Sequence, residues 1–187
     1  MNPPKIYKEE LNKVFELMNK AQTLKWEVWQ EYVIFTAHWW AGIFLTIIPW
    51  ILWIFFHKKE STNRMLFVGF FIMLISSFLD FLGVRLGLWL YYYDIIPFIP
   101  AYFPWDCTLI PVLVMFFIEV KPKTNPLLKA LLFGSLTAFV AEPLFEFVGL
   151  YKPLKWEHIY SFPIFTSLYL IAHFLSKRKN FQELVNK

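Results

Sequence analysis

The chain has 187 residues, of which 58% are hydrophobic, 21% aromatic and only 17% charged. Soluble domains carry about a quarter charged residues, so this composition excludes a soluble globular protein, a disordered chain and a disulfide-rich secreted module. The net charge is +4. Most of the basic residues lie between apolar segments, which favours a role in membrane orientation over nucleic-acid binding. The sequence therefore predicts an all-α, polytopic transmembrane helix bundle.

The first segment, residues 1–32, is predicted to be an amphipathic interfacial helix, because its apolar residues recur at helical spacing over residues 5–31. Favourable pairs such as Glu9 with Lys13 lie four residues apart on the other side. Such a helix suits the headgroup layer of a bilayer. It equally suits packing against a partner helix or a second copy of the chain.

Five apolar segments follow, and they define a predicted bundle over residues 33–176, with a basic C-terminal tail at 177–187. A membrane span needs about 20 apolar residues. The third and fifth segments are short, so four spans plus a re-entrant hairpin is an alternative to five spans. The segments run over residues 33–56, 65–89, 106–120, 126–150 and 159–176.

Five spans place the two termini on opposite sides of the membrane. With the N-terminus outside, eight lysines and arginines of the short flanking segments lie inside and five lie outside. The positive-inside rule then favours an N-out, C-in protein of the cell membrane, by a small margin.

A weak internal repeat relates the second and fourth segments. Residues 79–83 read Leu-Asp-Phe-Leu-Gly, and residues 145–149 read Phe-Glu-Phe-Val-Gly. This pairs Asp80 with Glu146. Chance similarity between phenylalanine-rich segments explains the match equally well, and a true repeat would favour a site at the repeat interface.

The most informative residues are ionisable groups within or beside the apolar segments. Because successive spans alternate in direction, these groups gather toward one membrane face whichever way the protein is inserted. A carboxylate in a span is costly and usually faces the bundle interior. The candidate ligand-binding residues are Asp80, Arg85, Asp106, Glu142, Glu146, Trp89, Trp156 and His158.

Glu142 and Glu146 lie four residues apart, so both carboxylates project from one helix face and repel each other. One of the two is expected either to keep its proton or to pair with a cation. Arg85 is the best cation, because it follows Asp80 by five residues and a guanidinium can clamp carboxylates with two hydrogen bonds. Pro143, between the two acids, is expected to disturb the helix and free the carbonyl of Phe139.

Three interpretations of these acids stay open: they fix the register of the bundle, they line a ligand or catalytic pocket, or they form an ion or proton path. No metal site is expected, since the four histidines form no ligand pair at metal spacing. No cofactor is expected either, because neither a phosphate-binding loop nor a nucleophile elbow is present.

The stretches His38-Trp39-Trp40, Leu79-Asp80, Pro104-Trp105-Asp106, Glu142-Pro143-Leu144 and Tyr160-Ser161-Phe162-Pro163 resemble an uncharacterised family of small multi-span membrane proteins of Bacillus- and Clostridium-type bacteria. The resemblance covers residues 30–176. It implies a membrane location and a helical fold, and it implies no activity.

Gly87-Leu88-Trp89, Pro104-Trp105-Asp106 and Phe116 also resemble, more distantly, the membrane domains of lycopene-cyclase type. Asp106 stands where that motif has Glu, and its second acid falls at Cys107 or Thr108. This resemblance implies a pocket for an isoprenoid-like lipid, with carboxylates as proton donors.

The sequence therefore favours a membrane protein whose one-sided polar cavity binds a lipid or a small amphiphile. The alternatives are an enzyme that performs acid–base chemistry on an isoprenoid-like lipid and a small transporter. Membrane lipids are the expected partners, with no nucleic acid.

Overall fold

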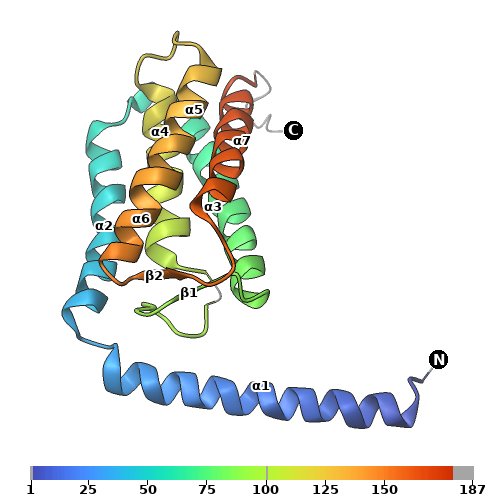
Figure 1. Ribbon diagram of the computed structural model, residues 1–187. Coiled ribbons are helices and arrows are strands. Elements are labelled where there is room, and N and C mark those ends of the chain that lie inside the picture. The colour runs from blue at the N-terminus through green and yellow to red at the C-terminus, as the bar shows by residue number, and fades with distance from the viewer. Residues whose placement is uncertain (1, 100, 179–187) are drawn as a thin grey trace, which may run out of the picture.

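The computed structural model describes residues 2–99 and 101–178, and it confirms the predicted all-α bundle (Figure 1). Part of the expected basic tail, residues 179–187, lies outside the described residues. The bundle contains α2 (Ala37–Phe56), α3 (Thr62–Arg85), α4 (Ile110–Glu119), α5 (Pro126–Leu136), α6 (Glu142–Phe147) and α7 (His158–Ser176).

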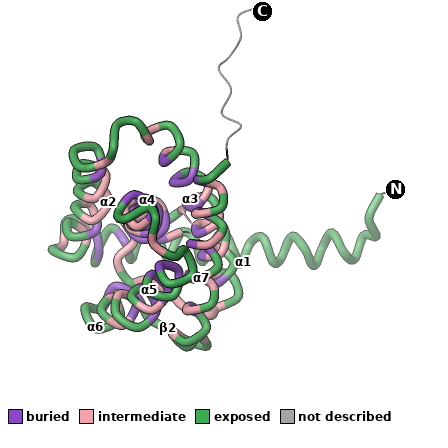
Figure 2. Tube along the Cα trace, turned by 90° about the horizontal axis from the view of Figure 1, so that it is seen from above, coloured by how far each residue is buried: buried purple, intermediate pink, exposed green. Residues whose placement is uncertain are grey.

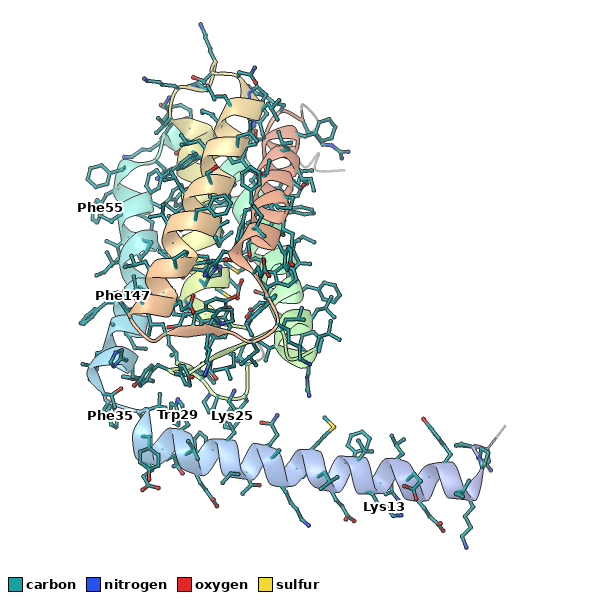
Figure 3. All side chains as sticks on the ribbon, viewed as in Figure 1. Lys13, Lys25, Trp29, Phe35, Phe55 and Phe147 are labelled. Atoms are coloured by element: carbon teal, nitrogen blue, oxygen red, sulfur yellow. The ribbon has the colours of Figure 1, made fainter. Side chains whose placement is uncertain are left out.

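Four helical segments are long and apolar enough to cross a membrane: Ala37–Phe56, Lys59–Arg85, Pro126–Phe147 and His158–Ser176. Their outer surfaces carry large apolar side chains that point away from the bundle. Phe55 and Phe147 are 78% and 87% exposed (Figure 3). In water this exposure would be unfavourable, whereas hydrocarbon solvates it.

The third apolar segment forms α4, which runs alongside the other helices and does not turn back as a re-entrant hairpin (Figure 1). Ile110, Val114 and Met115 of α4 are fully buried, and the view from above places α4 among the other helices (Figure 2). Gly69 of α3 permits this close packing, because a Cβ there would overlap the sulfur of Met115. The core of the bundle therefore forms around α4.

Two wide π-helical turns interrupt the helices, and both have the same local cause. The turns Trp105–Leu109 and Thr137–Ala141 each end two residues before a proline, Pro111 and Pro143. Proline lacks an amide hydrogen and clashes with the carbonyl four residues earlier, and a π turn relieves the clash. The carbonyl of Cys107, four residues before Pro111, instead accepts a hydrogen bond of 3.1 Å from the indole of Trp50.

At the end of the bundle that carries the acids, two short strands pair antiparallel: β1 (Trp89–Tyr91) and β2 (Tyr151–Pro153). A left-handed glycine precedes each strand by two residues, Gly87 with φ 65° and Gly149 with φ 75°. The register is centred on Leu90 opposite Lys152, an offset of 152 − 90 = 62 residues. Glu142 follows Asp80 by the same 62 residues (142 − 80 = 62), and so does Gly149 relative to Gly87. By their positions before the two strands, Asp80 therefore corresponds to Glu142 and not to Glu146.

The helix α1 (Lys5–Tyr32) runs across this same end of the bundle, nearly at right angles to the other helices (Figure 1). Only its C-terminal part contacts the bundle. The indole of Trp29 donates to the carbonyl of Asp94 at 2.7 Å, and Lys25 pairs with the Asp94 carboxylate at 2.7 Å. Trp26 stacks on Phe98. Most of α1 therefore extends beyond the bundle as an exposed arm.

Candidate functional site

The Asp80 carboxylate is the best-connected polar group at this end of the bundle. It is 5% exposed and accepts three hydrogen bonds: from the indole of Trp89 and the hydroxyl of Tyr91, both at 2.7 Å, and from the backbone amide of Tyr102 at 2.9 Å. Three donors around one carboxylate stabilise its charged form. Asp80 is therefore surrounded by neutral hydrogen-bond donors.

Gly83 makes the bond between Trp89 and Asp80 possible. The chain reverses after α3, and the indole of Trp89 folds back over the last turn of that helix. A Cβ at position 83 would overlap the six-membered ring of Trp89. The glycine predicted to end the repeat motif is thus needed for a close approach of a side chain, and the left-handed conformation occurs instead at Gly87.

Asp106 lies beside Asp80 but has a different environment. It is 2% exposed, and its carboxyl group interacts directly with that of Asp80. Its oxygen Oδ2 is buried and has no hydrogen-bond donor within the described residues. The hydroxyl of Ser76 donates to the backbone carbonyl of Asp106 at 3.0 Å and holds this turn against α3. The two neighbouring acids therefore differ: one is surrounded by donors and the other has a free oxygen.

Glu142 and Glu146 are joined by His158 at the start of α7. The ring atom Nδ1 lies 3.0 Å from Glu142, and Nε2 lies 2.9 Å from Glu146. The side chain of Glu142 is 11% exposed and that of Glu146 is 46% exposed. His158 thus connects an inner carboxyl group to an outer one.

The inner acids line a common cavity of about 70 Å³ between α3, the π turn Trp105–Leu109, α6 and α7. Six of the fourteen described residues that line it are aromatic, and none of the fourteen is a lysine or an arginine. The lining residues with polar groups are Ser76, Asp80, Trp89, Tyr91, Trp105, Asp106, Glu142, Tyr151, Trp156 and Ser161.

Of the candidate residues, Asp80, Asp106, Glu142, Trp89 and Trp156 line this cavity. His158 and Glu146 lie next to it and are linked to it through Glu142.

Arg85 lies outside the cavity, contrary to the expectation that it clamps the carboxylates. Its exposed guanidinium stacks over the ring of Phe81 at 5.6 Å, and it forms no ion pair within residues 2–99 and 101–178. The physical reason is that His158 already joins Glu142 and Glu146, and Asp80 has three neutral donors, so none of these carboxyl groups needs the guanidinium.

Three large residues that line the cavity, Tyr91, Trp105 and Tyr151, were not predicted as site residues from the sequence. Tyr91 is one of three consecutive tyrosines, and only the alternation of strand β1 turns it toward Asp80. Burial and the nearby Asp80 raise the pKa of Tyr91 well above its ordinary value, so its hydroxyl stays a donor. Trp105 and Tyr151 are the other large additions, and their burial depends on packing that no local pattern reveals.

The part of the chain that the structure describes contains no group of three histidine, cysteine or acidic side chains placed to hold a metal ion. The donor set of the cavity is carboxyl, indole, phenol and hydroxyl groups. Such a set can bind a cation or a hydrogen-bond donor, and it can hold a proton.

The four apolar spanning segments and the lipid-like exterior define the chain as a membrane protein. Comparisons with protein-family models, with curated proteins and with solved structures found no match to this chain.

Proposed function

We propose that the acidic cavity binds the polar end of a membrane amphiphile, and that this end is a cation or a hydrogen-bond donor. The observation that carries the proposal is the buried Oδ2 of Asp106, which has no donor although it lines a cavity. A buried carboxyl oxygen without a donor is unfavourable, and a ligand N–H group would satisfy it.

The size of the cavity limits what enters it. About 70 Å³ is far below the roughly 300–1,000 Å³ of sites that enclose a whole ligand. It suits a single small group, such as a primary ammonium, while the rest of the molecule stays in the bilayer. The proposed ligand is therefore an amphiphile with a slender polar end.

The aromatic wall supports a cationic end. Indole and phenol rings attract ammonium groups through their negative faces. Trp89 and Trp156 meet edge to face with ring centres 5.2 Å apart, and both line the cavity with Asp80. The carboxyl groups would supply the countercharge. Among the described residues that line the cavity there is no lysine or arginine, and His158 contacts Glu142 but neither Asp80 nor Asp106.

A thermal-shift experiment on the purified protein in detergent tests this binding. Decylamine is expected to raise Tm, whereas decanoate and decyltrimethylammonium, which share its chain, are not. Asp106→Asn should abolish the decylamine shift. Glu119→Gln is the matched control, because Glu119 is also buried but is bonded to Ser61 elsewhere in the bundle. Equal shifts with decylamine and decanoate, or a full shift in Asp106→Asn, would refute the proposal.

A second candidate function is acid catalysis on an isoprenoid-like lipid, and the asymmetry between Asp80 and Asp106 favours it. Two adjacent acids with different environments can divide into a stable anion and a proton donor. Asp106 would then give its proton to a double bond, and the carbocation that forms would lose a proton from a neighbouring carbon to a carboxylate of the cavity, so that the lipid is isomerised and the acid is restored. Lipid mass spectrometry of cells that express the wild-type chain or Asp106→Asn tests this, and identical lipid profiles would reject it.

We also propose that α1 lies on the bilayer surface. Leu11 precedes Trp29 by 18 residues and Tyr7 precedes Lys25 by 18, which is five turns at 3.6 residues per turn. The apolar stripe of the arm thus faces the same way as the docked residues, toward the side of the bundle, whereas Lys13 points away (Figure 3). Membrane-impermeant maleimide should label Lys13→Cys faster than Leu11→Cys in a Cys107→Ser background, and equal rates would contradict this placement.

For orientation we propose N-out and C-in in the cell membrane. Lys121, Lys123 and Lys177 lie at the end of the bundle opposite α1, where the positive-inside rule expects basic residues on the cytoplasmic side. Protease accessibility of the N-terminal arm in intact cells tests the assignment.

A further inference from the structure

A second hollow lies at the other end of the bundle, in the side wall between α4 and α5. It has a volume of about 380 Å³ and is open to the exterior. Its floor is apolar and includes Phe116, Leu128 and Leu132. Lys121, Thr124 and Lys129 border it, but their polar atoms contribute almost nothing to its surface. The groove itself is therefore apolar and suits an acyl chain, whereas the basic groups lie beyond its edge.

Lys129 is the unusual residue of this groove. It is only 9% exposed, and its ammonium donates to the carbonyl of Phe117 at 2.6 Å and to the carbonyl of Val120. Both carbonyls belong to the end of α4, where a positive charge is favourable. No carboxylate forms an ion pair with Lys129 in the described part of the chain, although buried charges are normally paired.

Within residues 2–99 and 101–178, the surroundings of the groove add positive charge and no compensating negative charge. Lys177, at the end of α7, is close enough to Lys129 to interact with it electrostatically. Glu119 precedes the groove in sequence, but its carboxylate accepts a hydrogen bond from Ser61 on the α3 side. Among the described residues, the edge of the groove therefore has no anionic side chain.

We propose that this groove is a binding site for an anionic phospholipid. One acyl chain lies along the floor, and the phosphate lies at the rim against Lys121 and Lys129, with the Thr124 hydroxyl as a further donor. The site occurs where the helices end, at the level at which a phospholipid carries its phosphate. Charge complementarity selects an anionic headgroup over a zwitterionic one, because each nearby lysine favours a negative lipid.

Native mass spectrometry of the detergent-purified protein measures the selectivity. With phosphatidylglycerol and phosphatidylcholine of identical chains, we expect about a 30-fold preference for the anionic lipid, at about fivefold per lysine. Lys121→Gln should lower that preference to about fivefold. Lys58→Gln is the matched control, since it removes the same charge from an exposed position in another loop and should leave the preference unchanged.

Lys129→Gln also removes the group that caps α4, so Leu132→Trp provides an independent variant. It fills the groove without changing any charge, and it should weaken the binding of both lipids. Glycerol phosphate, which lacks the chains, should not compete with phosphatidylglycerol. Equal binding of the two lipids to the wild type, an equal loss in Lys58→Gln and Lys121→Gln, or full binding by Leu132→Trp would each overturn the proposal.

Discussion

Each end of the bundle buries an ionisable side chain, an acid at the α1 end and a lysine at the other end. At the α1 end, Asp80 is buried among indole, phenol and amide donors. At the other end, Lys129 is buried among backbone carbonyls. Within the described residues, no lysine or arginine of the bundle helices forms an ion pair with a bundle carboxylate. Neutral groups therefore surround both ionisable side chains.

The absence of lysine or arginine ion pairs in the described bundle explains why each end is suited to a ligand of a different charge. Direct ion pairs would have cancelled the charge of both ends. Neutral partners stabilise the charge and leave it available, so the acidic end favours cations or donors and the basic end favours anions. Substitutions at one end should therefore leave ligand binding at the other end unchanged.

Asp80→Leu is expected to have the largest effect. It leaves the donors of Trp89, Tyr91 and Tyr102 without an acceptor in a buried site, and each such donor costs about 1–3 kcal/mol, so a loss of at least about 3 kcal/mol in the free energy of unfolding should follow. Unfolding in mixed micelles measures it. Asp80→Asn keeps an acceptor oxygen and should lose less. A loss equal to that of Asp80→Leu would show that the negative charge itself is required.

Gly83→Ala should cost about 2 kcal/mol, because the new Cβ overlaps Trp89 and forces the indole away from Asp80. A red shift in tryptophan fluorescence should accompany the loss. Gly87→Asn is the control: nothing lies near a Cβ at that position, and asparagine tolerates its φ of 65°. If both variants behaved alike, the close approach of Trp89 would not be the cause.

His158→Gln tests the link between the inner and outer acids at the α1 end. The amide cannot reach both Glu142 and Glu146 as the ring does, so about 1 kcal/mol of stability should be lost. The selectivity of the groove at the other end for anionic lipid should not change. A change in that selectivity would mean that the two ends are coupled.

The smallest effect concerns the docking of α1. Burial raises the pKa of Asp94, and Lys25 only partly opposes it. A raised folded-state pKa means that the contribution to stability is complete below the ordinary value of 3.8 and is lost as the pH rises through the raised value. Acidification from neutral pH should therefore not release α1, and Asp94→Asn should keep it docked. Spin labels on α1 and on the bundle would measure this, and release at low pH would contradict it.

The sequence predicted the fold and much of the acidic end for simple physical reasons. Span lengths and alternating direction do not depend on side-chain packing, so Asp80, Asp106 and Glu142 could be assigned to one face before their contacts were known. The alignment of the two repeat units was harder to predict. The motif match paired Asp80 with Glu146, whereas the strand register relates Asp80 to Glu142, because the backbone turns at Gly87 and not at Gly83.

Partners of the charged groups could not be predicted in the same way. Arg85 was the obvious cation for Asp80, but the donors come from a strand and a loop whose positions depend on the pairing of β1 with β2. Lys129 was not considered as a site residue, since a lysine near the start of an apolar segment usually reaches the membrane surface. Its burial follows from the packing of α5 on the end of α4.

Infrared difference spectroscopy of the carboxyl groups tests the central claim, that Asp106 contacts the bound ligand, most directly. When decylamine is added to the wild type in bilayers, the carboxyl stretching region should change, and this change should be absent in Asp106→Asn and retained in Glu119→Gln. An identical difference spectrum in Asp106→Asn, or no carboxyl change in the wild type despite measured binding, would contradict it.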